Sequence, residues 1–117
     1  MSNSDRSHPS TKLLALAAMA CRPEPPRLNA DELAAHLTTL SDWSLRGDHI
    51  EKTFSFGNYY ETIAFVNALA WIAHRADHHP DLGVHYNKCV VTYSTHSAGG
   101  VSINDVICAA QIERLHA

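Results

Sequence analysis

Three helix-start signals divide this chain of 117 residues and limit the folds that it can adopt. Each is a cap residue followed three positions later by an acidic residue, at Asn29–Glu32, Asn58–Glu61 and Ser102–Asp105. In such a capping box the cap side chain accepts a hydrogen bond from the third helical residue, whose own side chain binds back. We therefore expect three helices, and the segments between them must supply the rest of the fold.

The segments between these helices have the character of paired strands. Trp43–Arg46 and Ile50–Phe56 flank Gly47-Asp48, which predicts a hairpin. A short extended piece, Val84–Tyr86, precedes a run rich in β-branched residues, Cys89–Thr95. The order helix, strand, strand, helix, strand, strand, helix predicts one α+β domain. We expect a four-stranded antiparallel sheet with the helices on one face.

Apolar positions at helical spacing identify the inward face of each helix. They are Leu33, Leu37 and Leu40 in the first; Ile63, Val66, Ala70 and Ala73 in the second; and Ile103, Val106, Ile107 and Ala110 in the third. Pro80 requires the second helix to stop by about His79.

The N-terminal part reads as an extension, residues 1–26, ahead of a domain over residues 27–117. Residues 1–10 are Ser-rich and are expected to be disordered, and the Pro-rich segment 22–26 is expected to be a linker. The apolar run Leu13–Ala20 before Cys21 resembles a lipoprotein signal but is too short to span a membrane. A short helix packed on the domain, or a loose arm, is the better interpretation.

Charge and cysteine content narrow the class of protein. Nine Lys and Arg against twelve Asp and Glu give a net charge of −3, so nothing favours nucleic-acid binding. The three cysteines are scattered and form no CxxC pair, which predicts reduced thiols in a cytoplasmic protein with no membrane association. Histidine is unusually frequent: there are nine, and five fall between His74 and His96.

Four interpretations of the histidine cluster compete. His74 and His78 have the i, i+4 spacing of a zinc site, but Arg75 stands between them and no third ligand is fixed by spacing. Histidines at a helix C-terminus can simply cap carbonyls. Cys89 could act as a nucleophile with a histidine, although no oxyanion-hole glycine motif accompanies it. Two imidazoles could instead serve as acid and base near neutral pH.

Asp105 is the natural carboxylate partner for such a histidine, and it has two interpretations. It could hold one imidazole in a fixed orientation. It also stands at the third helical position of a capping box, where it could serve only the helix start. The residues alone leave these two roles open.

Four segments taken in order resemble the pterin-4a-carbinolamine dehydratase family. They are Asp77–Pro80, Tyr86–Lys88, Ser94–His96 and Gly100–Asp105, and the match extends from about Asn29 to Leu115. The separations also agree, with 18 residues from His78 to His96 and nine from His96 to Asp105. The predicted element order is the one that this family has.

The resemblance implies an activity and a set of site residues. Members dehydrate 4a-hydroxytetrahydrobiopterin to quinonoid dihydropterin, which recycles tetrahydrobiopterin, without metal or organic cofactor. His78 and His96 would be the acid–base pair, His79 would hold the substrate, and Asp105 would bias a histidine. The implied pterin contacts are His78, His79, Pro80, Thr95, His96, Ser97 and Ala98. Trp43 matches a tryptophan near the family's pocket, although a core position explains it equally well.

The resemblance also implies partners and one departure. The family forms homodimers and homotetramers and serves pterin-dependent aromatic amino acid hydroxylases. Some relatives instead bind or assemble other proteins, so a non-catalytic binding role is the alternative function. His74 stands where many members have Glu.

Overall fold

Each of the three helix-start signals begins a helix in the computed structural model, which describes residues 10–116. The helices are α3 (Ala30–Thr39), α4 (Tyr59–Ala76) and α5 (Ile103–His116). Asn29 accepts a hydrogen bond from the Glu32 amide, and the Glu32 carboxylate accepts one from the Asn29 amide, so this capping box is complete. The expectation of three helices is confirmed, and the first capping box shows the local chemistry responsible.

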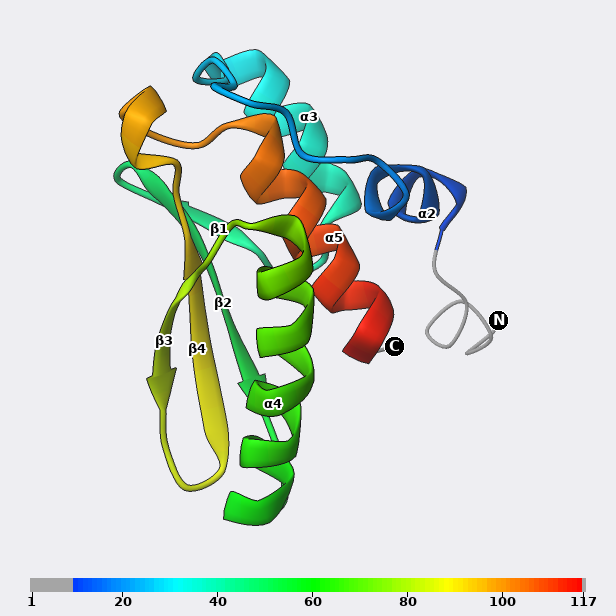
Figure 1. Cartoon of the computed structure of the whole chain (residues 1–117), viewed down its shortest axis with the longest axis vertical. Coiled ribbons are helices and arrows are strands. Elements are labelled where there is room, and N and C mark those ends of the chain that lie inside the picture. The colour runs from blue at the N-terminus through cyan, green and yellow to red at the C-terminus, as the bar shows by residue number, and fades with distance from the viewer. Residues whose placement is uncertain (1–9, 117) are drawn as a thin grey trace.

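The strands form one antiparallel sheet of order β1-β2-β4-β3 (Figure 1). Its members are β1 (Ser44–Arg46), β2 (His49–Ser55), β3 (Asp81–Val84) and β4 (Lys88–Tyr93). The predicted hairpin joins β1 and β2, and Gly47 turns it with a left-handed φ of 64°. The expected α+β fold with a four-stranded antiparallel sheet is therefore correct.

The third strand lies earlier in the chain than predicted. It spans Asp81–Val84 and pairs with β4, whereas the extended piece was expected at Val84–Tyr86. Leu82 faces the core, and a hydrogen bond of 2.9 Å from the His85 amide to the Lys88 carbonyl oxygen closes the turn. The strand thus starts directly after Pro80, and the turn uses residues that had been assigned to the strand.

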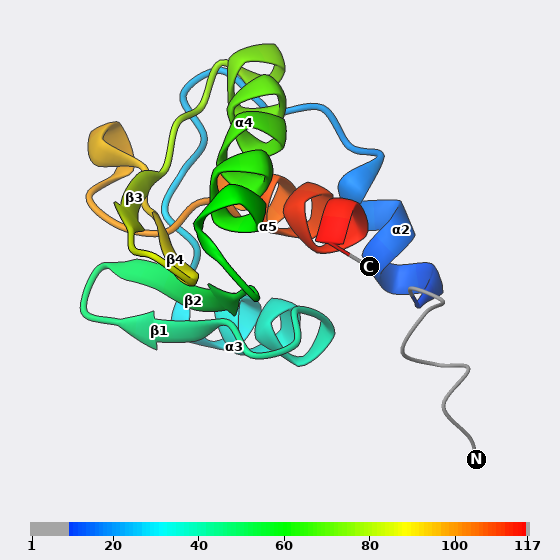
Figure 2. The ribbon, with the colours of Figure 1, turned by 90° about the horizontal axis from the view of Figure 1, so that it is seen from below.

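One face of the sheet is buried and the other is open. Ile50 and Phe54 of β2 and Cys89 and Val91 of β4 are buried, whereas Thr53, directly before Phe54, and Lys88, directly before Cys89, are exposed. This alternation has the two-residue period of a strand. Figure 2 shows α4 and α5 on one side of the sheet, whereas α3 overlaps the β1–β2 hairpin in this view. The core lies between the sheet and these helices, as expected.

The inward face of α4 is offset from the predicted one. Its largest buried side chains are Phe65, Leu69 and Ile72, whereas Ala70, which had been expected inside, is exposed. The larger side chains lie beside the predicted face on the helix, and they take the inward positions. Burial of the larger apolar area is the more favourable choice.

A short helix from the N-terminal extension covers the far side of α5. Helix α2 (Thr11–Ala17) is capped by Ser10 and buries Leu13 and Leu16 against the domain. The Gln111 amide donates a 3.1 Å hydrogen bond to the Ala17 carbonyl. Because α2 covers it on one side and the rest of the domain on the other, α5 is buried nearly all round. Disorder was predicted for residues 1–10; residues 1–9 lie outside the described residues, and Ser10 instead caps α2. None of the helices over residues 10–116 is long and apolar enough to cross a membrane.

Candidate active site

The end of α4 positions the first candidate histidine. The helix stops at Ala76, and Asp77 follows in a left-handed conformation with φ 53°. The amide of His78 then returns to the Ala73 carbonyl oxygen at 3.1 Å, which closes the helix end. The chain therefore leaves α4 in a fixed direction, and His78 is held against the domain rather than on a free loop.

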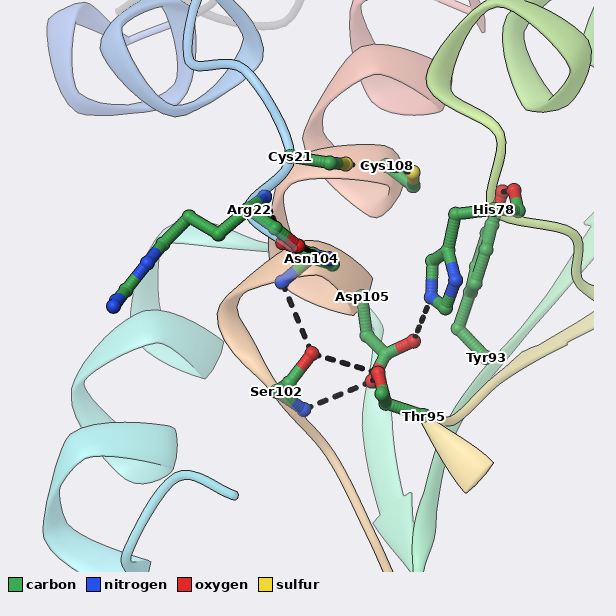
Figure 3. A network of polar contacts seen from close by, with 9 residues as sticks. All are labelled: Cys21, Arg22, His78, Tyr93, Thr95, Ser102, Asn104, Asp105 and Cys108. Atoms are coloured by element: carbon green, nitrogen blue, oxygen red, sulfur yellow. Dashed lines mark hydrogen bonds and ion pairs between the residues drawn. The ribbon is translucent and has the colours of Figure 1, made fainter. Parts of the chain in front are cut away.

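His78 contacts Asp105, the residue that the sequence had left with two roles. Its Nε2 atom lies 2.5 Å from Oδ1 of Asp105, so the imidazole N–H donates to the carboxylate (Figure 3). Asp105 is fully buried, whereas the His78 side chain is 17% exposed. The contact fixes the tautomer, with the proton on Nε2 and the Nδ1 atom free for other chemistry.

The second carboxylate oxygen of Asp105 serves the start of α5. Oδ2 accepts the Ser102 amide at 2.9 Å and the Thr95 hydroxyl at 2.8 Å. The Ser102 hydroxyl lies 2.6 Å from the Thr95 hydroxyl. The Ser102 hydroxyl also accepts a hydrogen bond of 3.2 Å from the backbone N–H of Asn104. Asp105 therefore serves the start of α5 with one oxygen and contacts His78 with the other, so it is not confined to the helix start.

Tyr93 fixes the plane of the His78 ring. The two rings stack with centroids 5.3 Å apart and an interplanar angle of 27° (Figure 3). The Tyr93 hydroxyl donates a long hydrogen bond of 3.4 Å to the His78 carbonyl oxygen. Burial raises the pKa of Tyr93 well above its usual range, so the phenol stays neutral. His78 is thus held by a carboxylate at its ring nitrogen and by an aromatic ring along its face.

The second candidate histidine lies on the turn after β4. His96 opens a short 3₁₀ helix, η1 (His96–Ala98), and its side chain is exposed. Thr95, whose hydroxyl binds Asp105, pairs with Gly100 through a 2.8 Å backbone hydrogen bond. The turn that carries His96, Ser97 and Ala98 is therefore tied at its base to the carboxylate that holds His78.

The remaining candidates are distributed as follows. His79 is exposed and Pro80 is half-buried, and both directly follow His78. The structure thus brings the side chains of His78, Thr95 and Asp105 together. It places His79, Pro80, His96, Ser97 and Ala98 on the two segments that lead to and from this cluster.

Two residues noted in the sequence lie outside this cluster. The Trp43 indole donates to Glu113 at 2.9 Å and its ring contacts Phe54 edge-on, so it is a core residue. His74 is exposed on the last turn of α4, and its ring lies 6.4 Å from that of Trp71.

Tyr93 and Ser102 also belong to this cluster, although the sequence motifs do not mark them as site residues. Tyr93 had been assigned only to a strand, yet strand alternation from Cys89 and Val91 places it on the inner face. Ser102 had been assigned only to a helix start.

Cys89 is fully buried on the inner face of β4, and burial raises its pKa, which does not suit a nucleophile. Over residues 10–116, no three His, Cys, Asp or Glu side chains gather as metal ligands would.

Comparison with known proteins identifies what the chain resembles. Residues 26–115 match the profile of the family described as pterin 4 alpha carbinolamine dehydratase. A protein of Nitrosospira multiformis named "Putative pterin-4-alpha-carbinolamine dehydratase" is 52% identical over 103 residues, which cover 86% of this chain and 91% of that protein. A protein of the same name from Chromobacterium violaceum is 61% identical over 79 residues, or 68% of this chain and 73% of that protein.

A solved structure agrees with these sequence relatives. The crystal structure described as a transcriptional coactivator/pterin dehydratase from Brucella melitensis has a TM-score of 0.74 and 30% sequence identity to this chain. The comparison covers 78% of this chain and 99% of that one. The shared part therefore includes essentially the whole of the solved domain.

Proposed function

Because the chain belongs to the pterin 4 alpha carbinolamine dehydratase family, we propose that it dehydrates 4a-hydroxytetrahydrobiopterin to quinonoid dihydropterin by acid–base catalysis. The observation that carries the proposal is the His78–Asp105 contact of 2.5 Å. Burial of a carboxylate costs free energy, and a neutral side chain would cap the helix at a lower cost. A buried carboxylate that also holds a partly exposed imidazole is what proton transfer at a small substrate requires.

The reaction needs one proton donor and one proton acceptor. The substrate carries a hydroxyl group and a ring nitrogen on the same carbon. Protonation of the hydroxyl lets the carbon–oxygen bond break, and removal of the proton on that nitrogen leaves its electron pair to form the carbon–nitrogen double bond. Water is the only other product. Such assistance contributes typically ~10²–10⁴-fold, which suffices for a reaction that already proceeds slowly by itself.

The site residues divide between these tasks. With the His78 proton on Nε2 and directed to Asp105, the Nδ1 lone pair can accept the proton of the substrate nitrogen. His96, exposed on the turn after β4, supplies the proton to the leaving hydroxyl. Both histidines reach solvent, so their protonation states are restored after each turnover.

The neighbouring residues hold the pterin. His79 and Pro80 follow His78, and Ser97 and Ala98 follow His96, so the substrate lies between these two segments. Thr95 is only 6% exposed and its hydroxyl already binds Asp105. Any contact of Thr95 with the pterin is therefore made by its backbone.

The proposed setting is a cytoplasmic homo-oligomer that recycles the pterin cofactor of an aromatic amino acid hydroxylase. The alternative is a binding or assembly role without catalysis. The Brucella melitensis protein is described as a transcriptional coactivator as well as a pterin dehydratase, which suggests a binding role for that protein. The retained His78–Asp105 pair favours the enzyme, because a surface for protein binding does not need a buried carboxylate at an imidazole.

The test is turnover of freshly generated 4a-hydroxytetrahydropterin, followed by the absorbance of the quinonoid product. The proposal expects a rate that rises linearly with enzyme above the buffer background. A folded protein that leaves the background rate unchanged would support the binding role instead.

A further inference from the structure

Two cysteines that the proposed mechanism does not use lie against each other behind the site. The Sγ atoms of Cys21 and Cys108 are 3.9 Å apart, although 87 positions separate them in the chain (Figure 3). Cys108 is on α5, and Cys21 is in the extended segment after α2. Cys21 also precedes residues 26–115, the part that matches the family. The contact therefore joins the N-terminal extension to the domain.

A second, independent contact holds Cys21 in this place. The Asn104 side chain accepts the Arg22 amide at 2.9 Å and donates to the Arg22 carbonyl oxygen at 2.8 Å. Asn104 lies one helical turn before Cys108 and is only 7% exposed. These two hydrogen bonds fix the backbone next to Cys21. The position of its sulfur atom beside Cys108 is therefore set by the packing of this segment on α5.

The two thiols differ in access. Cys108 is fully buried, whereas Cys21 is half-buried. Burial raises the pKa of both thiols. An oxidant can therefore reach only Cys21 directly, and the reaction accelerates as pH rises because the thiolate is the attacking species.

We propose that Cys21 and Cys108 form a reversible disulfide that fastens the N-terminal extension to α5. Closure brings the sulfur atoms to about 2.05 Å. Cys108 is fixed in a packed helix, so most of this movement falls on Cys21 and its extended segment. The inference does not depend on the dehydratase activity.

The chemistry needs an oxidant, and a low-molecular-weight disulfide such as oxidised glutathione supplies it. The Cys21 thiolate attacks one sulfur of this disulfide and releases one glutathione thiolate. The Cys108 thiolate then attacks Cys21 in the mixed disulfide and releases the second. Both protein protons pass to the two released thiolates, so the protein loses two hydrogen atoms and two glutathione thiols form.

The experiment treats the native full-length protein with oxidised glutathione, quenches with acid, denatures it and alkylates the remaining thiols. We expect peptide mapping to find Cys21 joined to Cys108 and only Cys89 alkylated. Cys89 is fully buried on β4, so it is the internal control for unfolding. The melting temperature should rise by several degrees on oxidation and return with dithiothreitol, because a cross-link between distant residues restricts the unfolded chain.

Cys21→Ser is the variant that isolates the pair, because Cys21 is only half-buried at the border of the core, whereas Cys108 is fully buried. It should fold normally, lose the cross-link and show no shift in melting temperature on oxidation. A stable glutathione adduct on Cys21 in the wild-type protein would overturn the proposal, as would three alkylated thiols after treatment. If Cys89 is not alkylated after denaturation, it has already been oxidised, which requires the chain to have unfolded during the treatment. Random reaction of an unfolded chain would also contradict the proposal.

Discussion

The Asp105→Asn substitution separates the two roles of this side chain. Oδ2 accepts the Ser102 amide and the Thr95 hydroxyl, so the amide oxygen of Asn will take that position. The amide nitrogen is then directed at Nε2 of His78, where the carboxylate stood. Two donors cannot face each other, so the His78 proton must move to Nδ1. The helix start survives, but the nitrogen that should accept the substrate proton becomes a donor.

The magnitudes follow from what is lost. We expect the maximal dehydration rate to fall by about 10²-fold, the lower part of the range for acid–base assistance, because His96 still acts. The hydrogen bond between His78 and a charged carboxylate is replaced by one with a neutral amide, which should cost about 1–3 kcal/mol of unfolding free energy. For Asp105→Ala the Ser102 and Thr95 donors are also left unpaired, so the loss should be larger.

The assay is stopped-flow absorbance on freshly generated 4a-hydroxytetrahydropterin, with nitrogen NMR of His78 as the second readout. The NMR should report the proton on Nε2 in the wild-type protein and on Nδ1 in Asp105→Asn. A variant with the switched tautomer but a rate within about threefold of wild type would refute the role given to Nδ1.

Three further predictions concern residues around and away from the site. Tyr93→Phe keeps the ring on His78 and should retain most of the activity. Tyr93→Leu removes the stack and should slow dehydration about tenfold, with a changed pH–rate profile. Equal rates of the two variants would show that the stack does not position His78. Glu113→Ala removes the half-buried carboxylate that lies 2.6 Å from Lys52, which then keeps only the Ser41 carbonyl oxygen. It should cost about 1–3 kcal/mol by chemical denaturation while the rate constant of the folded fraction stays unchanged. Finally, the raised pKa of buried Cys108 means that its thiol stays protonated in the folded chain at pH values where it ionises in the unfolded chain. The unfolding free energy should therefore be insensitive to this thiol below its ordinary pKa of 9.0 and should fall above that pH. Denaturant titrations from pH 8 to 10.5 measure this dependence. An unfolding free energy that stays constant over this range would contradict the burial of Cys108.

Local chemistry explains why so much of the fold could be predicted. A capping box involves residues three positions apart, so Asn29 and Glu32 reveal their helix without knowledge of anything distant. The Gly47-Asp48 turn is equally local. The boundaries of β3 were missed because they depend on where Leu82 meets its partner strand, which is a long-range property.

Packing of distant elements explains what the sequence could not show. The inward face of α4 was decided by the fit of Phe65 and Leu69 to the sheet, not by spacing alone. The burial of α5 on nearly all sides depends on α2, which comes from the N-terminal extension. The stack of Tyr93 on His78 joins a strand to a helix end, and no local pattern marks it.

The site was partly predictable for the same reasons. The order and spacing of His78, His96 and Asp105 carried the resemblance to the family. That Asp105 serves both His78 and the helix start could not be read from either pattern separately, because each uses a different oxygen of one carboxylate.

The most direct test of the central claim is the dehydration rate of 4a-hydroxytetrahydropterin with wild-type protein, His78→Ala, His96→Ala and the double variant, all checked for folding by circular dichroism. We expect a clear rate above background for the wild-type protein. Each single variant should lose about 10²-fold or more, and the double variant should lie near the background. Wild-type protein at the background rate, or single variants that keep near-normal rates, would contradict acid–base catalysis by these two histidines.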